Sequence, residues 1–179
     1  MAALLPAMVS GDADRLPSRA GVEGCSSRSE GQFPRPFQNR ENLTAGPFAL
    51  VGAAGRPSWF EPAGGQKFPL IVKTGRRVTV SIPRRAAGFA GLTYGGRGSG
   101  YRDARRKVTF IACERGEAAA DRLRYRPFWS GFVLTDGPRC VPLRIRANGD
   151  GVRHLMIHLG VETCETERGL IRHAGTPSG

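Results

Sequence analysis

The stretch Cys140-Val-Pro-Leu-Arg-Ile-Arg-Ala-Asn-Gly-Asp-Gly-Val-Arg-His-Leu-Met-Ile-His-Leu-Gly-Val161 contains two alternating segments around a glycine-rich turn. Apolar side chains occupy every second position, at 141, 143 and 145 and again at 155, 157, 159 and 161. Successive side chains of a β-strand point to opposite faces of a sheet. The stretch therefore predicts two strands, 140–147 and 153–161, each with one buried face.

The same alternation predicts how the two strands pair. Directly opposite residues of an antiparallel pair lie on one face, so apolar positions must face apolar positions. A three-residue loop, Gly149-Asp150-Gly151, satisfies this condition, with Gly151 in the left-handed conformation. In this register Arg146 faces His154 and Arg144 faces Met156.

Toward the N-terminus, shorter runs of the same character recur between glycine and proline turns. They predict further strands at 48–52, 68–73, 77–82, 91–94, 108–113 and 128–134. The 25 glycines and 13 prolines disfavour helix interiors. We expect an all-β fold with little helix, a single antiparallel β-sandwich of about eight short strands, immunoglobulin-like or jelly-roll-like.

The length and composition favour one globular domain. A chain of 179 residues can bury its own core, and 40% apolar residues are too many for a wholly disordered protein. Segments 1–42 and 165–179 lack periodicity and are rich in turn residues, which predicts flexible ends. The predicted domain is 43–164.

The positive charge of the chain is concentrated in this domain. The net charge is +12, and residues 43–164 hold twenty basic against eight acidic residues. Such a domain should attract polyanions. Arginine, which supplies 24 of the 27 basic residues, can also be enriched by GC-rich codon usage.

The densest basic segment is 84–107, which has seven basic residues and one acidic residue. Phe89, Tyr94 and Tyr101 are interleaved with the charges, a pattern typical of surfaces that bind single-stranded nucleic acid. The glycines fit neither common phosphate-loop pattern, and a solvated loop is the simpler interpretation. The candidate polyanion contacts are Arg84, Arg85, Arg102, Arg105, Arg106 and Lys107.

The four cysteines, Cys25, Cys113, Cys140 and Cys164, include no CxxC pair and no zinc-site spacing. Two disulfides and buried free thiols are both compatible with them, and disulfides would indicate an oxidising compartment. Cys164 lies four residues beyond the position opposite Cys140. A bridge between these two would require the chain to bend back.

Chemistry-bearing clusters are sparse. His154, Met156 and His158 alternate along one predicted strand and would suit copper, but Arg144 and Arg146 on the facing strand would oppose a cation. No paired carboxylates and no nucleophile elbow stand out. We therefore predict a protein that is not an enzyme and has no cofactor.

Five stretches carry a resemblance: Cys25-Ser-Ser-Arg-Ser-Glu-Gly31, Asn42-Leu-Thr-Ala-Gly-Pro47, Gln66-Lys-Phe-Pro-Leu70, Phe128-Trp-Ser-Gly-Phe132 and Pro138-Arg-Cys-Val-Pro-Leu143. Together they resemble a group of small, uncharacterised actinobacterial proteins across residues 25–164. The resemblance implies an exported or surface-anchored β-domain with oxidised cysteines, and it implies no activity.

The resulting hypothesis is a non-enzymatic binding or structural domain, extracytoplasmic or in the cell envelope, that binds an anionic envelope polymer or a protein partner. The alternative is a nucleic-acid-binding module that uses segment 84–107, and a His/Met metal site ranks below both. No run approaches the ~18 apolar residues of a membrane span. Met1–Ser10 does not match an export signal, since it lacks a basic start and Pro6 breaks its apolar run.

Overall fold

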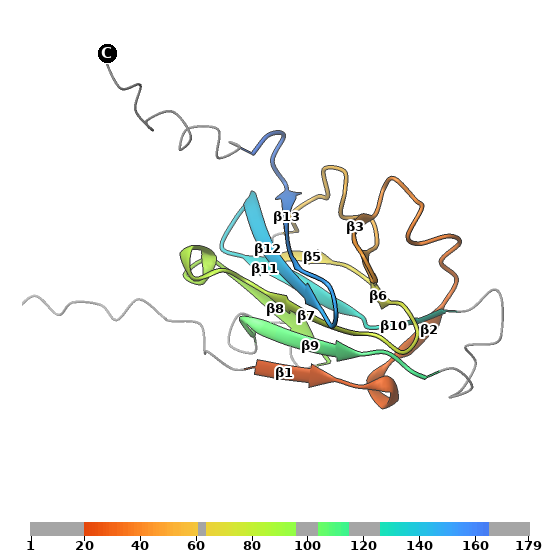
Figure 1. Cartoon of the computed structure of the whole chain (residues 1–179). Helices are drawn as coiled ribbons and strands as arrows, with labels where there is room; N and C mark the ends of the chain where they lie inside the picture. Colours follow the sequence, from red (N-terminus) through yellow and green to blue (C-terminus); the bar gives the residue numbers. More distant parts are fainter. Residues whose placement is uncertain (1–19, 61–63, 96–103, 115–125, 165–179) are drawn as a thin grey trace, which may run out of the picture.

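A computed structural model describes residues 20–60, 64–95, 104–114 and 126–164 (Figure 1). These parts of the chain form thirteen β-strands and two short 3-10 helices, which confirms the all-β class. Within them, no helix combines the length and apolar character that crossing a bilayer requires. Of the predicted flexible ends, 1–42 and 165–179, residues 1–19 and 165–179 lie outside the described residues.

The largest sheet has five strands in the order β1 (Ala20–Glu23), β9 (Lys107–Ile111), β7 (Arg77–Ser81), β12 (Arg139–Ala147) and β13 (Val152–Leu159). Figure 1 shows it from β1 at the lower edge to β13 in blue. Strands β9, β7, β12 and β13 pair antiparallel, whereas β1 pairs parallel with β9. We call this the main sheet.

Three smaller sheets complete the described fold. One contains β5 (Gly65–Lys67), β11 (Gly131–Thr135) and β8 (Ala90–Tyr94). A second contains β3 (Leu43–Ala45), β4 (Phe48–Leu50) and β6 (Leu70–Val72), and a third pairs β10 (Arg126–Phe128) with β2 (Ser29–Gly31). The 3-10 helices are η1 (Cys25–Ser27) and η2 (Arg84–Ala86).

The inner face of the main sheet contributes to one apolar core. Val78 and Val80 of β7 are buried there, while Arg77, Thr79 and Ser81 alternate with them on the outer face. Aliphatic side chains of β12 and β13 join aromatic ones from the smaller sheets in the same cluster. The alternation read from the sequence therefore identified the buried face correctly.

The predicted single sandwich is wrong, because the described strands form four sheets. The predicted strand 128–134 shows the cause. Its chain is interrupted at Trp129, whose N–H and C=O exchange 2.9 Å hydrogen bonds with Leu70, so β10 and β11 belong to different sheets. Most of the smaller-sheet strands have three residues, and positive φ angles at Gly46 and Gly52 turn the chain at the ends of β3 and β4.

The predicted start of the folded domain at residue 43 is too late. Strand β1 and strand β2 both lie within the segment expected to be flexible. The hydrophobic pattern could not identify β1, because Gly21 and Glu23 occupy its buried positions and Val22 is 66% exposed. The usual sign of a strand is an apolar side chain at every buried position, and β1 has a buried carboxylate and an exposed valine.

The β12–β13 hairpin keeps the predicted faces but not the predicted register. Arg144 is opposite His154 and not opposite Met156, a shift of two residues. Apolar positions still face one another at Val141–Ile157 and Leu143–Leu155, whereas Ile145 faces Arg153. Gly149, not Gly151, has the positive φ, and the N–H of Asp150 closes the turn onto the Ala147 carbonyl. A shift of two preserves the face of every side chain, so the alternation could not distinguish the registers.

The hairpin loop is anchored from outside the hairpin. The Arg76 guanidinium donates to the Asn148 carbonyl and to the Asp150 carboxylate, both at 3.0 Å. These contacts join residues more than seventy positions apart in the sequence. They hold the loop 148–151, which is longer than the three-residue loop that the local sequence pattern predicts.

All four cysteines are paired. Cys25 bonds to Cys113 and Cys140 bonds to Cys164, so the described chain has no free thiol. The chain bends back after β13 at Gly160, which has a positive φ and donates its N–H to the Pro57 carbonyl at 2.8 Å. This bend brings Cys164 to Cys140, as the second bridge requires.

Tyr94 belongs to the core and is not a surface aromatic. Its hydroxyl donates a 3.0 Å hydrogen bond to the Phe68 carbonyl, and its ring packs edge-on against Phe110. Burial raises the pKa of Tyr94 well above its ordinary value. The folded protein therefore keeps this proton at pH values where the unfolded chain releases it.

We expect stability to fall as the pH rises above about 10, because the unfolded state then binds fewer protons, by at most ~1.4 kcal/mol per pH unit. Tyr94→Phe should remove this slope and cost about 1–2 kcal/mol at pH 7 through the lost hydrogen bond. Urea unfolding at a series of pH values measures both quantities. An unchanged alkaline slope in the variant would contradict the assignment.

Candidate anion-binding groove

A row of side chains crosses four neighbouring strands on the outer face of the main sheet. Lys107 of β9 is opposite Ser81 of β7, which in turn is opposite Arg144 of β12. Arg144 is opposite His154 of β13. Strands lie about 4.8 Å apart, so this cross-strand row extends about 14 Å.

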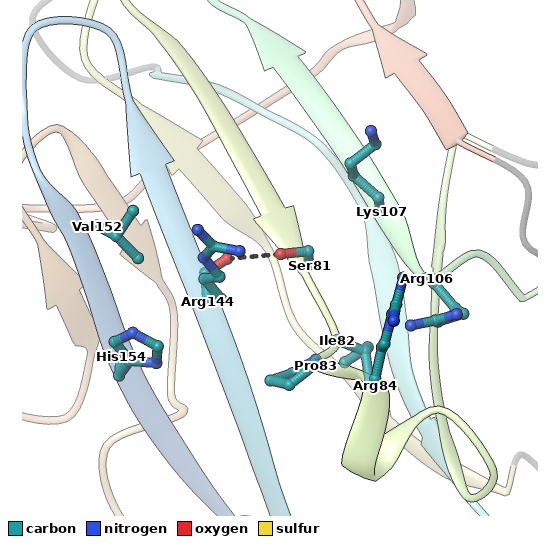
Figure 2. A pocket seen from close by; sticks show the side chains of 9 residues that line it. All are labelled: Ser81, Ile82, Pro83, Arg84, Arg106, Lys107, Arg144, Val152 and His154. Carbon is teal, nitrogen blue, oxygen red and sulfur yellow. Dashed lines mark hydrogen bonds between the residues drawn. The ribbon is translucent and has the colours of Figure 1, made fainter.

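An open groove with a volume of about 750 Å³ lies along this row (Figure 2). We call it the basic groove. It is lined by Ser81, Ile82, Pro83, Arg84, Arg106, Lys107, Arg144, Val152 and His154. These nine described residues include four fixed cations and no carboxylate.

Two arginines reach the groove from beyond the ends of their strands. Arg84 is the first residue of η2, which follows β7 directly after Pro83. Arg106 precedes β9. The Ile82 N–H donates a 2.8 Å hydrogen bond to the Arg106 carbonyl, which holds Arg106 beside the end of β7. Residues 22 positions apart in sequence thus meet at one end of the cross-strand row.

The four cations of the basic groove form no ion pair with any residue that the structure describes. Other arginines of the domain do form such pairs. Arg76 binds Asp150 at 3.0 Å, Arg105 binds Glu23 at 3.2 Å and Arg139 binds Asp136 at 2.7 Å. The positive charge of the groove therefore has no carboxylate partner in the described fold.

The six predicted polyanion contacts have different positions. Arg84, Arg106 and Lys107 line the basic groove, whereas Arg85 is exposed but does not line it. Arg105 instead contacts the buried carboxylate of Glu23. Arg102 lies outside the described residues.

The contribution of β12 and β13 to the groove is not predicted from the sequence. There, His154 belongs to the metal candidate and Arg144 is only a charge that opposes a cation. Their outward alternation was visible in the sequence, but their place beside Lys107 depends on the order of strands in the main sheet. That order follows from long-range pairing.

The two described aromatic residues of segment 84–107, Phe89 and Tyr94, do not form a stacking surface on the groove. Tyr94 is buried, and the half-buried Phe89 ring lies 4.5 Å from the guanidinium carbon of Arg139. Tyr101 is outside the described residues. The nine groove-lining residues include no Phe, Tyr or Trp, although base stacking requires accessible aromatic faces, and the imidazole of His154 is the one aromatic ring among them.

His154, Met156 and His158 do project from one face of β13. The pairing places Arg144, Pro142 and Cys140 opposite them, in place of the partners that the predicted register assigned. In the described part of the chain, no three His, Cys, Asp or Glu residues are grouped closely enough to hold a metal ion. Arg144 brings a fixed positive charge to His154, which disfavours a cation there.

No protein-family model matches the chain, and no curated protein matches it.

Proposed function

We propose that this protein is a non-enzymatic, extracytoplasmic domain that binds an anionic polymer of the cell envelope through the basic groove. The observation that carries the proposal is the convergence of four fixed cations on one groove of the main sheet, without an acidic partner among the residues that the structure describes. Unpaired cations on a single face attract polyanions and raise their rate of association.

The two disulfides support an oxidising compartment, because thiols in the cytosol are kept reduced. The resemblance to small actinobacterial exported β-domains points to the same location. A cell-envelope polymer is then a more accessible ligand than nucleic acid. The described groove lining contains no Phe, Tyr or Trp on which bases could stack, which further favours the polymer.

Binding should depend strongly on salt. Four cation contacts to a flexible polyanion predict a slope of about −3 for log K against log salt, by analogy with single-stranded nucleic acid. The affinity should therefore fall about 50-fold between about 50 and about 200 mM salt. Fluorescence anisotropy with a labelled glycerol-phosphate oligomer that ends in a phosphomonoester measures this slope. Binding that persists undiminished at high salt would contradict the proposal.

Arg144→Ala should weaken binding of the oligomer about three- to tenfold at low salt and reduce the salt slope by about 0.7, since one contact is lost. Arg153→Ala is the matched control. It removes the same charge from the adjacent strand β13 at an exposed position whose partner, Ile145, is on the core face. Equal losses in the two variants would indicate a general charge effect and contradict a groove.

A single-stranded oligonucleotide of equal charge distinguishes the alternative function. If the glycerol-phosphate oligomer binds at least as tightly, the polymer proposal is supported. A clear preference for the oligonucleotide would replace it with nucleic-acid binding.

A further inference from the structure

The two arginines at one end of the basic groove differ from the other two cations. In Figure 2 the Arg84 side chain rises from η2 toward the Arg106 side chain, while the Lys107 side chain points away from both. Arg84 is exposed and Arg106 is half-buried. Neither forms an ion pair with a described residue, so no acid of the described fold neutralises the two guanidinium groups at this end of the groove.

Arg106 also carries an unsatisfied donor. Its Nε is buried and has no hydrogen-bond partner within the described fold. A buried N–H of a charged group loses its contacts with water, so it stabilises the fold less than a satisfied donor. An anion at this end of the groove would accept hydrogen bonds from the terminal N–H groups and neutralise the charge on both arginines.

We propose that Arg84 and Arg106 form a subsite for a phosphomonoester group. This inference rests on the proposed function and names the group of the polymer that the groove recognises. A phosphomonoester carries nearly two negative charges at neutral pH and three free oxygens, arranged tetrahedrally. Guanidinium groups donate paired, charge-assisted hydrogen bonds to such oxygens.

The chemistry of the subsite favours a phosphomonoester over the other common anions of polymers. A carboxylate has one charge and two oxygens in one plane, which suffices for one guanidinium fork. A phosphodiester also has one charge and only two free oxygens. Two guanidinium groups, each with its own charge and terminal N–H donors, are best satisfied by a dianion with three oxygens.

The experiment titrates the intact protein with three small probes: glycerol 3-phosphate, dimethyl phosphate and acetate. NMR follows the arginine Nε–H signals of Arg84 and Arg106. We expect the monoester to shift both signals and to bind at least about tenfold more tightly than either other probe, since an additional charge-assisted hydrogen bond is formed. Equal affinities for the three probes would overturn the inference.

Arg84→Lys keeps the charge and removes the guanidinium fork at an exposed position, so the fold should persist. It should weaken glycerol 3-phosphate binding about tenfold, whereas Arg144→Ala should weaken it less than about threefold. Unchanged binding in Arg84→Lys would show that charge alone matters and would reject the subsite.

The two proposals fail in different ways. If the oligomer binds with the expected salt slope but the three small probes bind alike, the groove function stands and the subsite is rejected. If the monoester binds at Arg84 and Arg106 but the oligomer binds no more tightly than the monoester, the subsite stands and the polymer function is rejected.

Discussion

Removing the Cys25–Cys113 disulfide is expected to lower the free energy of unfolding by about 4–5 kcal/mol, which the chain-entropy model assigns to a loop of this size. The two cysteines are 88 residues apart, against 24 for Cys140–Cys164. The longer loop restricts the unfolded chain more, so removal of the shorter bridge should cost about 1 kcal/mol less. Urea unfolding of Cys25→Ser/Cys113→Ser and Cys140→Ser/Cys164→Ser gives the comparison.

Native contacts at the first bridge strengthen this expectation. Strand β1 pairs with β9 over four residues immediately before Cys25, and the Trp129 indole donates to the Gly24 carbonyl at 3.1 Å. The disulfide therefore adds a covalent link to an edge strand that β9, Trp129 and the Arg105–Glu23 ion pair already hold. A larger loss from the shorter bridge would contradict the entropic argument and indicate that native contacts near Cys140 dominate.

Arg105→Ala is expected to cost about 3–5 kcal/mol, because it leaves the carboxylate of Glu23 buried without its partner. The Glu23 side chain is 5% exposed, and the Arg105 guanidinium lies 3.2 Å from it. Gly21 and Gly95 make room for the pair: a Cβ at Gly21 would overlap Arg105, and one at Gly95 would overlap the Glu23 carboxylate. Urea unfolding at neutral pH measures the loss.

Two controls test the charge argument. Glu23→Gln/Arg105→Met removes both charges and should recover most of the stability lost in the single variant, since no unpaired ion remains buried. Arg56→Ala removes an exposed arginine 4.0 Å from Glu162 and should cost no more than about 0.5 kcal/mol. If the double variant is as unstable as Arg105→Ala, lost packing and not the buried charge explains the effect.

The strongly alternating strands could be predicted from the sequence. Strands β7, β12 and β13 bury the faces that their apolar positions indicated, because a period of two directly reports the side that faces the core. Strand β1 could not be found this way, since its buried positions hold Gly21 and Glu23. The two-residue error in the hairpin register has a related cause, because both registers place the same residues inside.

The candidate site was predictable only in part. Segment 84–107 pointed to Arg84, Arg106 and Lys107, since cations clustered in sequence are conspicuous. It also pointed to Arg105 and Tyr94, which the fold uses internally. Sequence clustering does not separate a cation that faces solvent from one that neutralises a buried carboxylate.

By itself, the sequence determined the β class, the buried face of the alternating strands and the excess of positive charge on the domain, because these depend on composition and on neighbouring residues. Only the tertiary structure decided the four sheets, the pairing of the cysteines and the meeting of Lys107, Arg144 and His154 on one surface. Those features come from contacts between distant segments. Local periodicity carries no information about which strand lies beside which.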